Sequence, residues 1–315
     1  MSRSLRLRLP LFILVLLGAI AGSCAWFTFR DLSRTLERAA GTRVERASGR
    51  LLSMLAESVD RIRADARRTA RNEALAQAIR TRDAASLVAA RRAMTEDIAG
   101  GTGGSRSLWT RGCERVLDVQ LDSAAVPIGE CPLAAPELAA LARDGDWRVW
   151  IQPLAAHGEM VRYDAIAPVL AKSGDTLGYF VERRMLRNAN TGRAIGELIG
   201  RDVRVLLGNA SGPALWTDLS RKVQSPAIGA ERDRWTYYDG PDGSRLIGVA
   251  RNVPHTPWVV LVTLPRTNVM EPVHATMRQL GIIVLVALAA GLAGAWLIGR
   301  HVTSPLRALA GAADA

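Results

Sequence analysis

One predicted strand combines the residue types that bind small acidic molecules. In residues 147–153 the two-residue alternation of a β-strand places Arg148 and Trp150 on the same face. A guanidinium pairs with a carboxylate through two parallel hydrogen bonds, and an indole beside it supplies an apolar wall. The alternative is that this face is merely solvated. We predict a ligand-binding face formed by this strand and its neighbours, with the residues Arg148, Trp150, Tyr163, Asp164 and Tyr179.

The sequence contains none of the common catalytic arrangements. It has no Gly-x-Ser-x-Gly turn, no His-Glu-x-x-His helix and no Cys–His pair at a usable spacing. None of its four histidines has a Cys or His partner at metal-ligand spacing. We therefore expect no enzymatic activity, no metal and no cofactor in this chain as given.

Two of the three cysteines predict a disulfide. Cys113 and Cys131 lie in the long segment between two apolar runs, whereas Cys24 lies inside the first run. An even pair of cysteines in an oxidising compartment indicates a disulfide bond.

Residues 9–29 and 279–299 are uncharged, apolar runs long enough to cross a membrane. As helices of 21 residues each, they span about 30 Å, the thickness of the hydrocarbon core of a bilayer. The first run could instead be a cleaved signal peptide, because arginines precede it. Its length and its aromatic end favour an uncleaved anchor.

The arginines beside the two runs predict the orientation of the chain. Three arginines precede the first run, and Arg300 and Arg307 follow the second. Basic residues remain on the cytoplasmic side, so both termini are expected in the cytoplasm and residues 30–278 outside the membrane. The formal net charge of +11 suggests nucleic acid, but an extracytoplasmic domain makes that an improbable partner, and we expect none.

The outer segment begins with helical patterns and continues with strands. Apolar residues at three- and four-residue steps predict a helix over 31–72, and shorter helices over 73–80 and 84–96. The glycine-rich residues 98–105 are interpreted as a linker. Residues 115–120 and 125–129 are predicted to form a hairpin. Alternation, turn residues and prolines predict the remaining elements: a helix over 136–143, strands over 147–153, 160–170, 176–185, 203–207, 214–217, 234–238, 244–252 and 258–264, and a helix over 266–278.

These patterns predict an α+β fold in which a long stalk helix precedes two PAS-like antiparallel sheets, flanked by two transmembrane helices. The predicted division of the chain is as follows: a cytoplasmic tail over 1–8, transmembrane helices over 9–29 and 279–299, the stalk and short helices over 31–99, a membrane-distal module over 100–200, a membrane-proximal module over 201–278, and a linker over 300–315.

The outer segment resembles the double Cache sensor family of bacterial receptors. Residues 72–83 are similar to the helix break after the stalk of that family, and residues 252–262 resemble its last strand, where a tryptophan follows a proline-bearing turn. Residues 301–310 resemble the opening of a HAMP linker, through Pro305, Leu306 and Leu309. The resemblance implies a dimer and a cytoplasmic kinase, cyclase or chemotaxis module, which is not present in this chain.

The sequence thus predicts a dimeric receptor of the bacterial inner membrane that binds a small ligand, such as an acidic metabolite, and transmits a change through its second membrane helix. The alternative is a membrane-anchored scaffold that binds a protein partner in the cell envelope and senses no small molecule.

Overall fold

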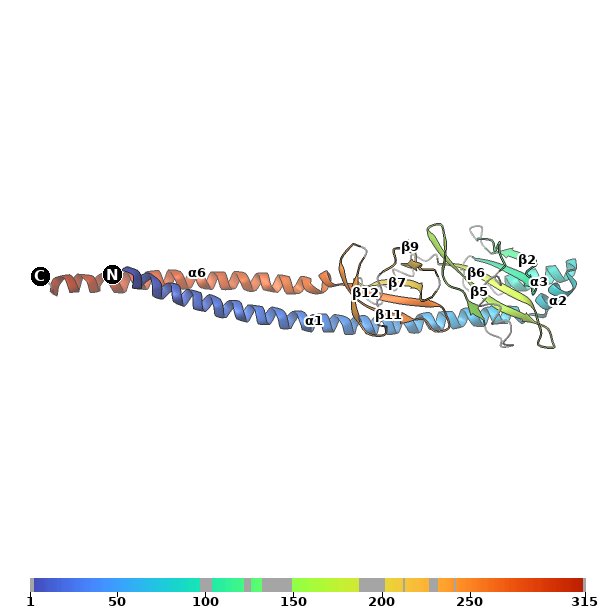
Figure 1. Ribbon diagram of the computed structural model, residues 1–315, viewed down its shortest axis with the longest axis horizontal. Helices are drawn as coiled ribbons and strands as arrows, with labels where there is room; N and C mark the ends of the chain where they lie inside the picture. Colours follow the sequence, from blue (N-terminus) through green and yellow to red (C-terminus); the bar gives the residue numbers. More distant parts are fainter. Residues whose placement is uncertain are drawn as a thin grey trace. The chain divides into compact units, whose positions relative to one another are not determined.

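The computed structural model describes most of the chain (Figure 1). The described residues are 3–96, 104–121, 126–131, 149–186, 202–211, 213–226, 232–240 and 242–313, and for 3–14, 17 and 295–313 the description is limited to the backbone. The chain divides into two units. One comprises residues 41–265, and the other comprises 1–40 together with 266–315.

The helices before the sheets lie where their apolar spacing predicts. Helix α1 (Arg3–Ala70) includes the predicted stalk. Its stripe of Val44, Leu51, Val59 and Ala66 is at most 2% exposed. The stalk was expected to begin at residue 31, but it is continuous with the preceding apolar run because no helix-breaking residue separates them. After α1, the Asn72 side chain caps α2 (Glu73–Thr81) by accepting a hydrogen bond from the Ala74 amide at 3.0 Å, and α3 (Ala84–Glu96) follows.

The first sheet is antiparallel, with the order β2-β1-β6-β5-β3 and with β4 paired to β5. Its strands are β1 (Gly104–Thr110), β2 (Arg115–Gln120), β3 (Trp150–Ile151), β4 (Ala155–His157), β5 (Met160–Leu170) and β6 (Thr176–Leu186). Helices α2 and α3 contact this sheet, and a Cβ atom added at Gly178 in β6 would lie 2.9 Å from the Ile79 side chain of α2.

The predicted hairpin of β2 with residues 125–129 is wrong. β2 pairs instead with β1, which begins inside the predicted linker, and the described residues 126–129 form no strand. Pro127 lacks a backbone N–H, so this segment is a poor central ladder partner. Its carbonyls are used by side chains instead: Val126 O accepts from the Ser105 hydroxyl at 2.5 Å, and Pro127 O accepts from Arg183 at 2.8 Å. The predicted helix over 136–143 lies outside the described residues.

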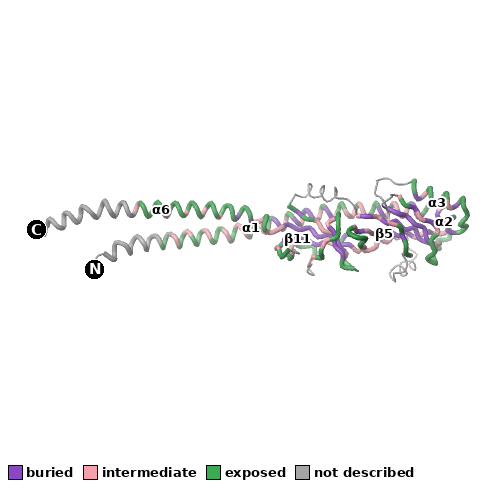
Figure 2. The backbone as a smooth tube through the Cα atoms, turned by 90° about the horizontal axis from the view of Figure 1, so that it is seen from above, coloured by how far each residue is buried: buried purple, intermediate pink, exposed green. Residues whose placement is uncertain are grey.

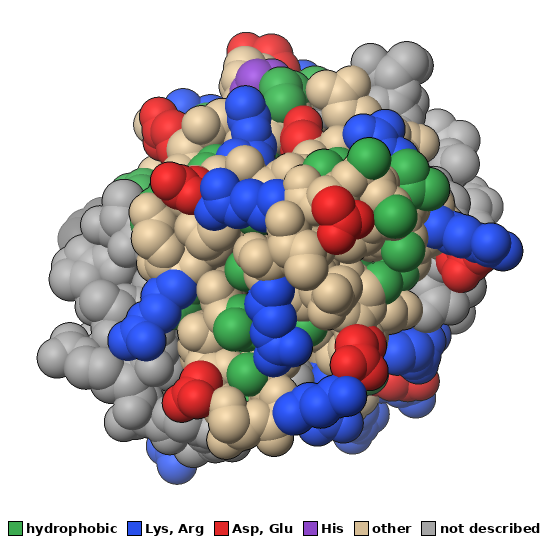
Figure 3. Space-filling model, turned by 90° about the vertical axis from the view of Figure 1, so that its right-hand side faces the viewer, with side chains coloured by type: hydrophobic (Ala, Val, Ile, Leu, Met, Phe, Trp, Pro, Cys, Tyr) green, Lys and Arg blue, Asp and Glu red, His purple; other side chains and the backbone are tan. Residues whose placement is uncertain are grey.

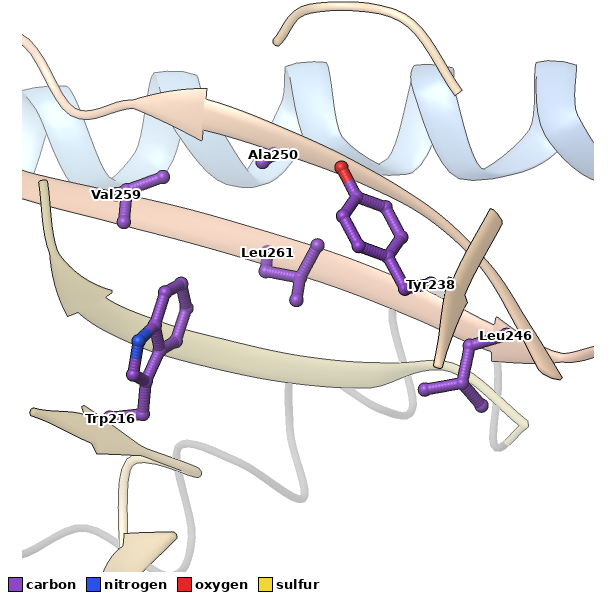
Figure 4. Packing of buried hydrophobic residues seen from close by; sticks show 6 residues of the cluster. All are labelled: Trp216, Tyr238, Leu246, Ala250, Val259 and Leu261. Atoms are coloured by element: carbon purple, nitrogen blue, oxygen red, sulfur yellow. The ribbon is translucent and has the colours of Figure 1, made fainter. Parts of the chain in front are cut away.

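The second sheet has the order β10-β11-β12-β7-β8-β9. Its strands are β7 (Arg204–Asn209), β8 (Trp216–Thr217), β9 (Lys222–Val223), β10 (Thr236–Asp239), β11 (Arg245–Asn252) and β12 (Trp258–Pro265). Figure 4 shows the apolar cluster of this sheet, in which the Trp216 and Tyr238 rings lie with Leu261 and Val259. The Trp216 ring lies over Gly208, where an added Cβ atom would come within 2.4 Å of it. Many of the buried residues lie along the strands of the sheets, as the purple segments of Figure 2 show.

The other unit contains helix α6 (Arg266–Ala313), which begins directly after β12. Among the described residues, its segment Arg266–Gly294 has the length and apolar composition to cross a membrane, and no part of its apolar stretch is buried. Within this unit, Arg266 forms a salt bridge with Glu37 of α1 at 2.7 Å. The side chains of Pro305, Leu306 and Leu309 lie outside the described residues, so the HAMP linker remains a prediction.

Cys113 and Cys131 are joined by a disulfide, with their Cα atoms 5.5 Å apart. Because a crosslink restricts the unfolded chain, Cys131→Ser should lower the free energy of unfolding by about 3 kcal/mol on the chain-entropy model. Thermal melting of the full chain in oxidising buffer measures this loss. The matched control is Cys24→Ser, which removes an exposed, free cysteine and should leave the melt unchanged. An unaltered melt of Cys131→Ser would show that the disulfide does not stabilise the fold.

Candidate functional site

The face of the first sheet that lies opposite α2 and α3 carries an aromatic cluster, and we call it the aromatic face. The cluster consists of Trp109, Ile128, Ile166, Tyr179 and Val181, with Trp150 and Cys131 packed against it. Strand register explains the grouping, because residues directly opposite in an antiparallel pair share a face. Trp109 lies opposite Tyr179, Val181 opposite Ile166, and Ile166 opposite Trp150.

This register brings together three of the predicted ligand residues and separates a fourth. Trp150, Asp164 and Tyr179 lie on the aromatic face, since Asp164 precedes Ile166 by two residues on β5. Tyr163 lies on the opposite face. Arg148, the residue expected to pair with an acidic ligand, lies outside the described residues.

Polar groups accompany the aromatic rings on this face. The Trp109 indole N–H donates to the Ser107 hydroxyl at 2.6 Å, and both residues are buried. Asp118 lies opposite Ser107 in the β1–β2 register and therefore belongs to the same face. Its Oδ1 atom is buried, and the described structure shows no hydrogen-bond donor for it. A buried carboxylate oxygen without a donor is costly, so a ligand or a water molecule that donates there would be favoured.

Asp164 is engaged by a residue that the sequence analysis missed. The Arg183 guanidinium donates to both Asp164 carboxylate oxygens, at 2.8 and 2.7 Å, and also to Pro127 O. Both side chains are less than a tenth exposed. A ligand that contacts Asp164 would thus have to compete with Arg183. The sequence signal was the run of charged residues Glu182, Arg183 and Arg184 within the predicted strand, but the partner of Arg183 could be found only from the register.

A second buried ion pair lies on the helix-covered face. Arg106 donates to Glu182 Oε1 at 3.0 and 3.2 Å and to the Met94 carbonyl of α3 at 2.6 Å. Arg184 reaches the same Glu182 oxygen at 3.1 Å. Nearby, burial raises the pKa of Tyr163 from its ordinary 10.0 to about 12, so its phenol ionises only at strongly alkaline pH. These contacts join β1 and β6 to α3, and they position the sheet without facing the aromatic side.

A separate hollow of about 400 Å³ lies where α1 ends, and none of the predicted ligand residues lines it. Arg71, Arg80 and Lys172 are among its lining residues, and Lys172 pairs with Glu73 at 2.9 Å across an exposed surface. Figure 3 shows that basic and acidic side chains intermingle on the face seen there. Among the described residues, no group of His, Cys, Asp or Glu is arranged to hold a metal. The arrangement suits non-covalent binding on the aromatic face.

The sequence matches no protein-family model and no curated protein. Several solved structures are similar. The extracellular domain of vpHK1S-Z8, a protein named as a histidine kinase, is 10% identical, with a TM-score of 0.50 over 77% of this chain and 96% of that one. The ligand-binding domain of the Pseudomonas aeruginosa amino acid chemoreceptor PctC, in complex with GABA, is 18% identical, with a TM-score of 0.47 over 72% of this chain and 99% of that one. The ligand-binding domain of the Pseudomonas fluorescens chemoreceptor CtaA, in complex with L-isoleucine, is 13% identical, with a TM-score of 0.48 over 77% of this chain and 97% of that one.

The chain therefore has the α+β fold of an extracytoplasmic sensor domain, and the predicted double Cache-like architecture is confirmed. At this level of identity the likeness establishes the fold alone.

The buried pair on the aromatic face predicts a large loss of stability. Arg183→Ala leaves the Asp164 carboxylate buried without its partner, which should lower the free energy of unfolding by about 3–5 kcal/mol. Chemical denaturation measures the change. The matched control is Arg162→Ala, since Arg162 lies 3.6 Å from the same carboxylate but is a quarter exposed, and its loss should cost about 1 kcal/mol or less. Equal losses in both variants would contradict the assignment.

The raised pKa of Tyr163 predicts a loss of stability at alkaline pH. The folded state holds the phenol proton more tightly than the unfolded state, whose pKa is near the ordinary 10.0. The Tyr163 phenol therefore contributes about 2–3 kcal/mol to the free energy of unfolding below pH 10. This contribution is lost as the pH rises towards about 12. Comparison of wild type with Tyr163→Phe by urea denaturation from pH 9 to about 11.5 isolates this contribution. Parallel curves for the two proteins would exclude it.

Proposed function

We propose that this chain is the sensing part of a bacterial transmembrane receptor, in which the aromatic face binds a small ligand. The observation that carries the proposal is the composition of that face. The Trp109, Trp150 and Tyr179 rings belong to one apolar cluster, and the same face carries, on the edge strand β2, the buried Asp118 Oδ1, for which the described structure shows no donor. Apolar walls with a few convergent polar groups are the usual composition of a small-molecule site. The fold of an extracellular sensor domain supports the same function.

The ligand class follows from which polar groups remain available. Arg183 is already engaged by Asp164 and Pro127 O, so its charge is not available for a ligand carboxylate. Asp118 offers an acceptor, which favours a ligand that carries a hydrogen-bond donor. The acidic metabolite expected from the sequence depends on Arg148. A zwitterionic molecule would supply both a hydrogen-bond donor for Asp118 and an acidic group for Arg148.

The route to the membrane follows the chain. β12 ends at Pro265, and α6, which contains the apolar segment Arg266–Gly294, begins at the next residue. We propose that the chain crosses the inner membrane twice, acts as a dimer without turning over its ligand, and passes its signal through α6 into a HAMP linker. The signal available is limited to the difference in the affinity of the ligand for the two signalling states.

The test is ligand binding by the full chain in detergent or nanodiscs. Amino acids, amines and organic acids are screened by thermal shift, and a hit is titrated by calorimetry. Trp150→Ala removes one half-buried indole from the aromatic face and should weaken binding about tenfold or more, a loss of about 1.4 kcal/mol or more. Trp235→Ala is the matched control, because it removes a half-buried indole that contacts Gly41 and Tyr237.

Three outcomes are informative. If Trp150→Ala lowers the affinity for the ligand and Trp235→Ala does not, the result supports the aromatic face as the binding site. Equal affinity in both variants places the ligand elsewhere. A chain that binds no small molecule but forms a stable complex with an envelope protein would be a scaffold, and the receptor function would be wrong.

A further inference from the structure

We propose that Asn209 and Trp258 form a clamp that couples the aromatic face of the first sheet to β12 of the second. The inference deepens the proposed function, because it identifies the residues through which a change at the ligand site reaches the strand before α6. The clamp is defined by these two residues, which lie directly opposite each other in the β7–β12 pair.

Asn209 holds the first sheet through both ends of its amide. Its Oδ1 accepts from the Leu154 backbone N–H at 2.7 Å, and its Nδ2 donates to the Leu154 carbonyl at 2.9 Å. One side chain thus makes the two hydrogen bonds that a neighbouring strand would make with that residue. Nδ2 also donates to Pro213 O at 2.9 Å, which ties the amide to the connection between β7 and β8. Leu154 is fully buried, so either backbone group would be costly to leave unpaired.

Trp258 holds the same edge two residues earlier. Its indole N–H donates to the Gln152 carbonyl at 3.1 Å, and its ring meets the Tyr163 ring edge-on, with centroids 4.9 Å apart. Both rings are at most 6% exposed. Such aromatic contacts are directional, so a shift of β5 or of the Gln152 backbone would displace the indole.

The clamped residues adjoin the candidate ligand residues in sequence and in the ladder. Gln152 follows Trp150 by two positions, and its N–H donates to the Asp164 carbonyl at 2.9 Å. Tyr163 immediately precedes Asp164. A displacement of Trp150 or Asp164 by a bound molecule would therefore move the backbone that the clamp holds. On the other side, Trp258 is the first residue of β12, and β12 leads directly into α6.

The coupling is measurable without a ligand, by hydrogen exchange of the full chain in detergent or nanodiscs. Ile166→Val loosens the aromatic cluster, and a small core truncation should increase the opening of the sheet about 2- to 10-fold. If the clamp couples the sheets, the β12 amides 259–264 should exchange faster by a comparable factor. The double variant Asn209→Ala/Trp258→Phe lacks the clamp. When Ile166→Val is added to this double variant, the exchange rates of the β12 amides should not change. The phenylalanine keeps an aromatic ring but lacks the N–H donor.

The matched control is Asn252→Ala/Trp216→Phe, which changes the same residue types in the second sheet. The contacts described for these side chains are with Arg232, just before β10, and with the apolar cluster of that sheet, and not with the first sheet. In this control, Ile166→Val should increase the exchange of the β12 amides by the same factor as in wild type. If the double clamp variant does not fold, Asn209→Asp replaces it, because it keeps an acceptor for the Leu154 N–H and removes both amide donations. In Asn209→Asp, Ile166→Val should increase the exchange of the β12 amides by a smaller factor than it does in wild type.

Two results would overturn the clamp. In the first, Ile166→Val does not change the exchange rates of the β12 amides in the otherwise wild-type chain. In the second, Ile166→Val still increases these rates when the clamp residues are changed. Neither result bears on whether the aromatic face binds a ligand. Conversely, a chain that binds no small molecule would refute the receptor function and leave the measured coupling intact.

Discussion

The central constraint in the first sheet is a run of three consecutive charged residues in β6, of which Glu182 and Arg183 are buried and Arg184 is partly buried. Successive side chains of a strand point to opposite faces, so no single partner could neutralise all three. Arg183 pairs with Asp164 on the aromatic face, while Glu182 receives Arg106 and Arg184 on the helix-covered face. A slip of one residue in the β5–β6 register would leave several charges buried and unpaired, at a cost of several kcal/mol each. The ion pairs therefore specify which residues share the aromatic face, even though the net contribution of each pair to stability is small.

The same alternation separates binding from support. The aromatic face holds rings, a hydroxyl and the Asp118 carboxylate, and the opposite face is tied to α3 through the Met94 carbonyl. A rigid support behind the site reduces the conformational entropy that a ligand must otherwise remove on binding. In the proposed coupling, displacement at the site would be transmitted along the edge of the sheet. That edge is the place where Asn209 and Trp258 make their contacts.

Sequence patterns predicted many element bounds closely. β5 occupies the predicted residues 160–170, and α3 the predicted 84–96. Periods of two and of 3.6 residues are local properties, and prolines and glycines mark their ends. The predicted hairpin failed because Pro127 lacks an N–H for a ladder and because local alternation contains no information about which strand β2 pairs with, which is β1. The clamp was missed for the same reason, since Asn209 and Leu154 are 55 residues apart in sequence. An asparagine at the end of a predicted strand is read as a turn residue unless its partner is known.

What the sequence alone determined about this protein is the class of each segment: apolar runs of membrane-spanning length, an amphipathic stalk, and strands whose alternation requires one buried face. These properties depend on residues within a few positions of one another. The tertiary structure decided which candidate residues meet. Trp150, Asp164 and Tyr179 lie on one face, whereas Tyr163 lies on the other against Trp258, and Arg183 takes both oxygens of Asp164. The physical reason is that strand register is set by the burial of whole faces and by charge neutralisation between distant strands, and neither can be read from any single segment.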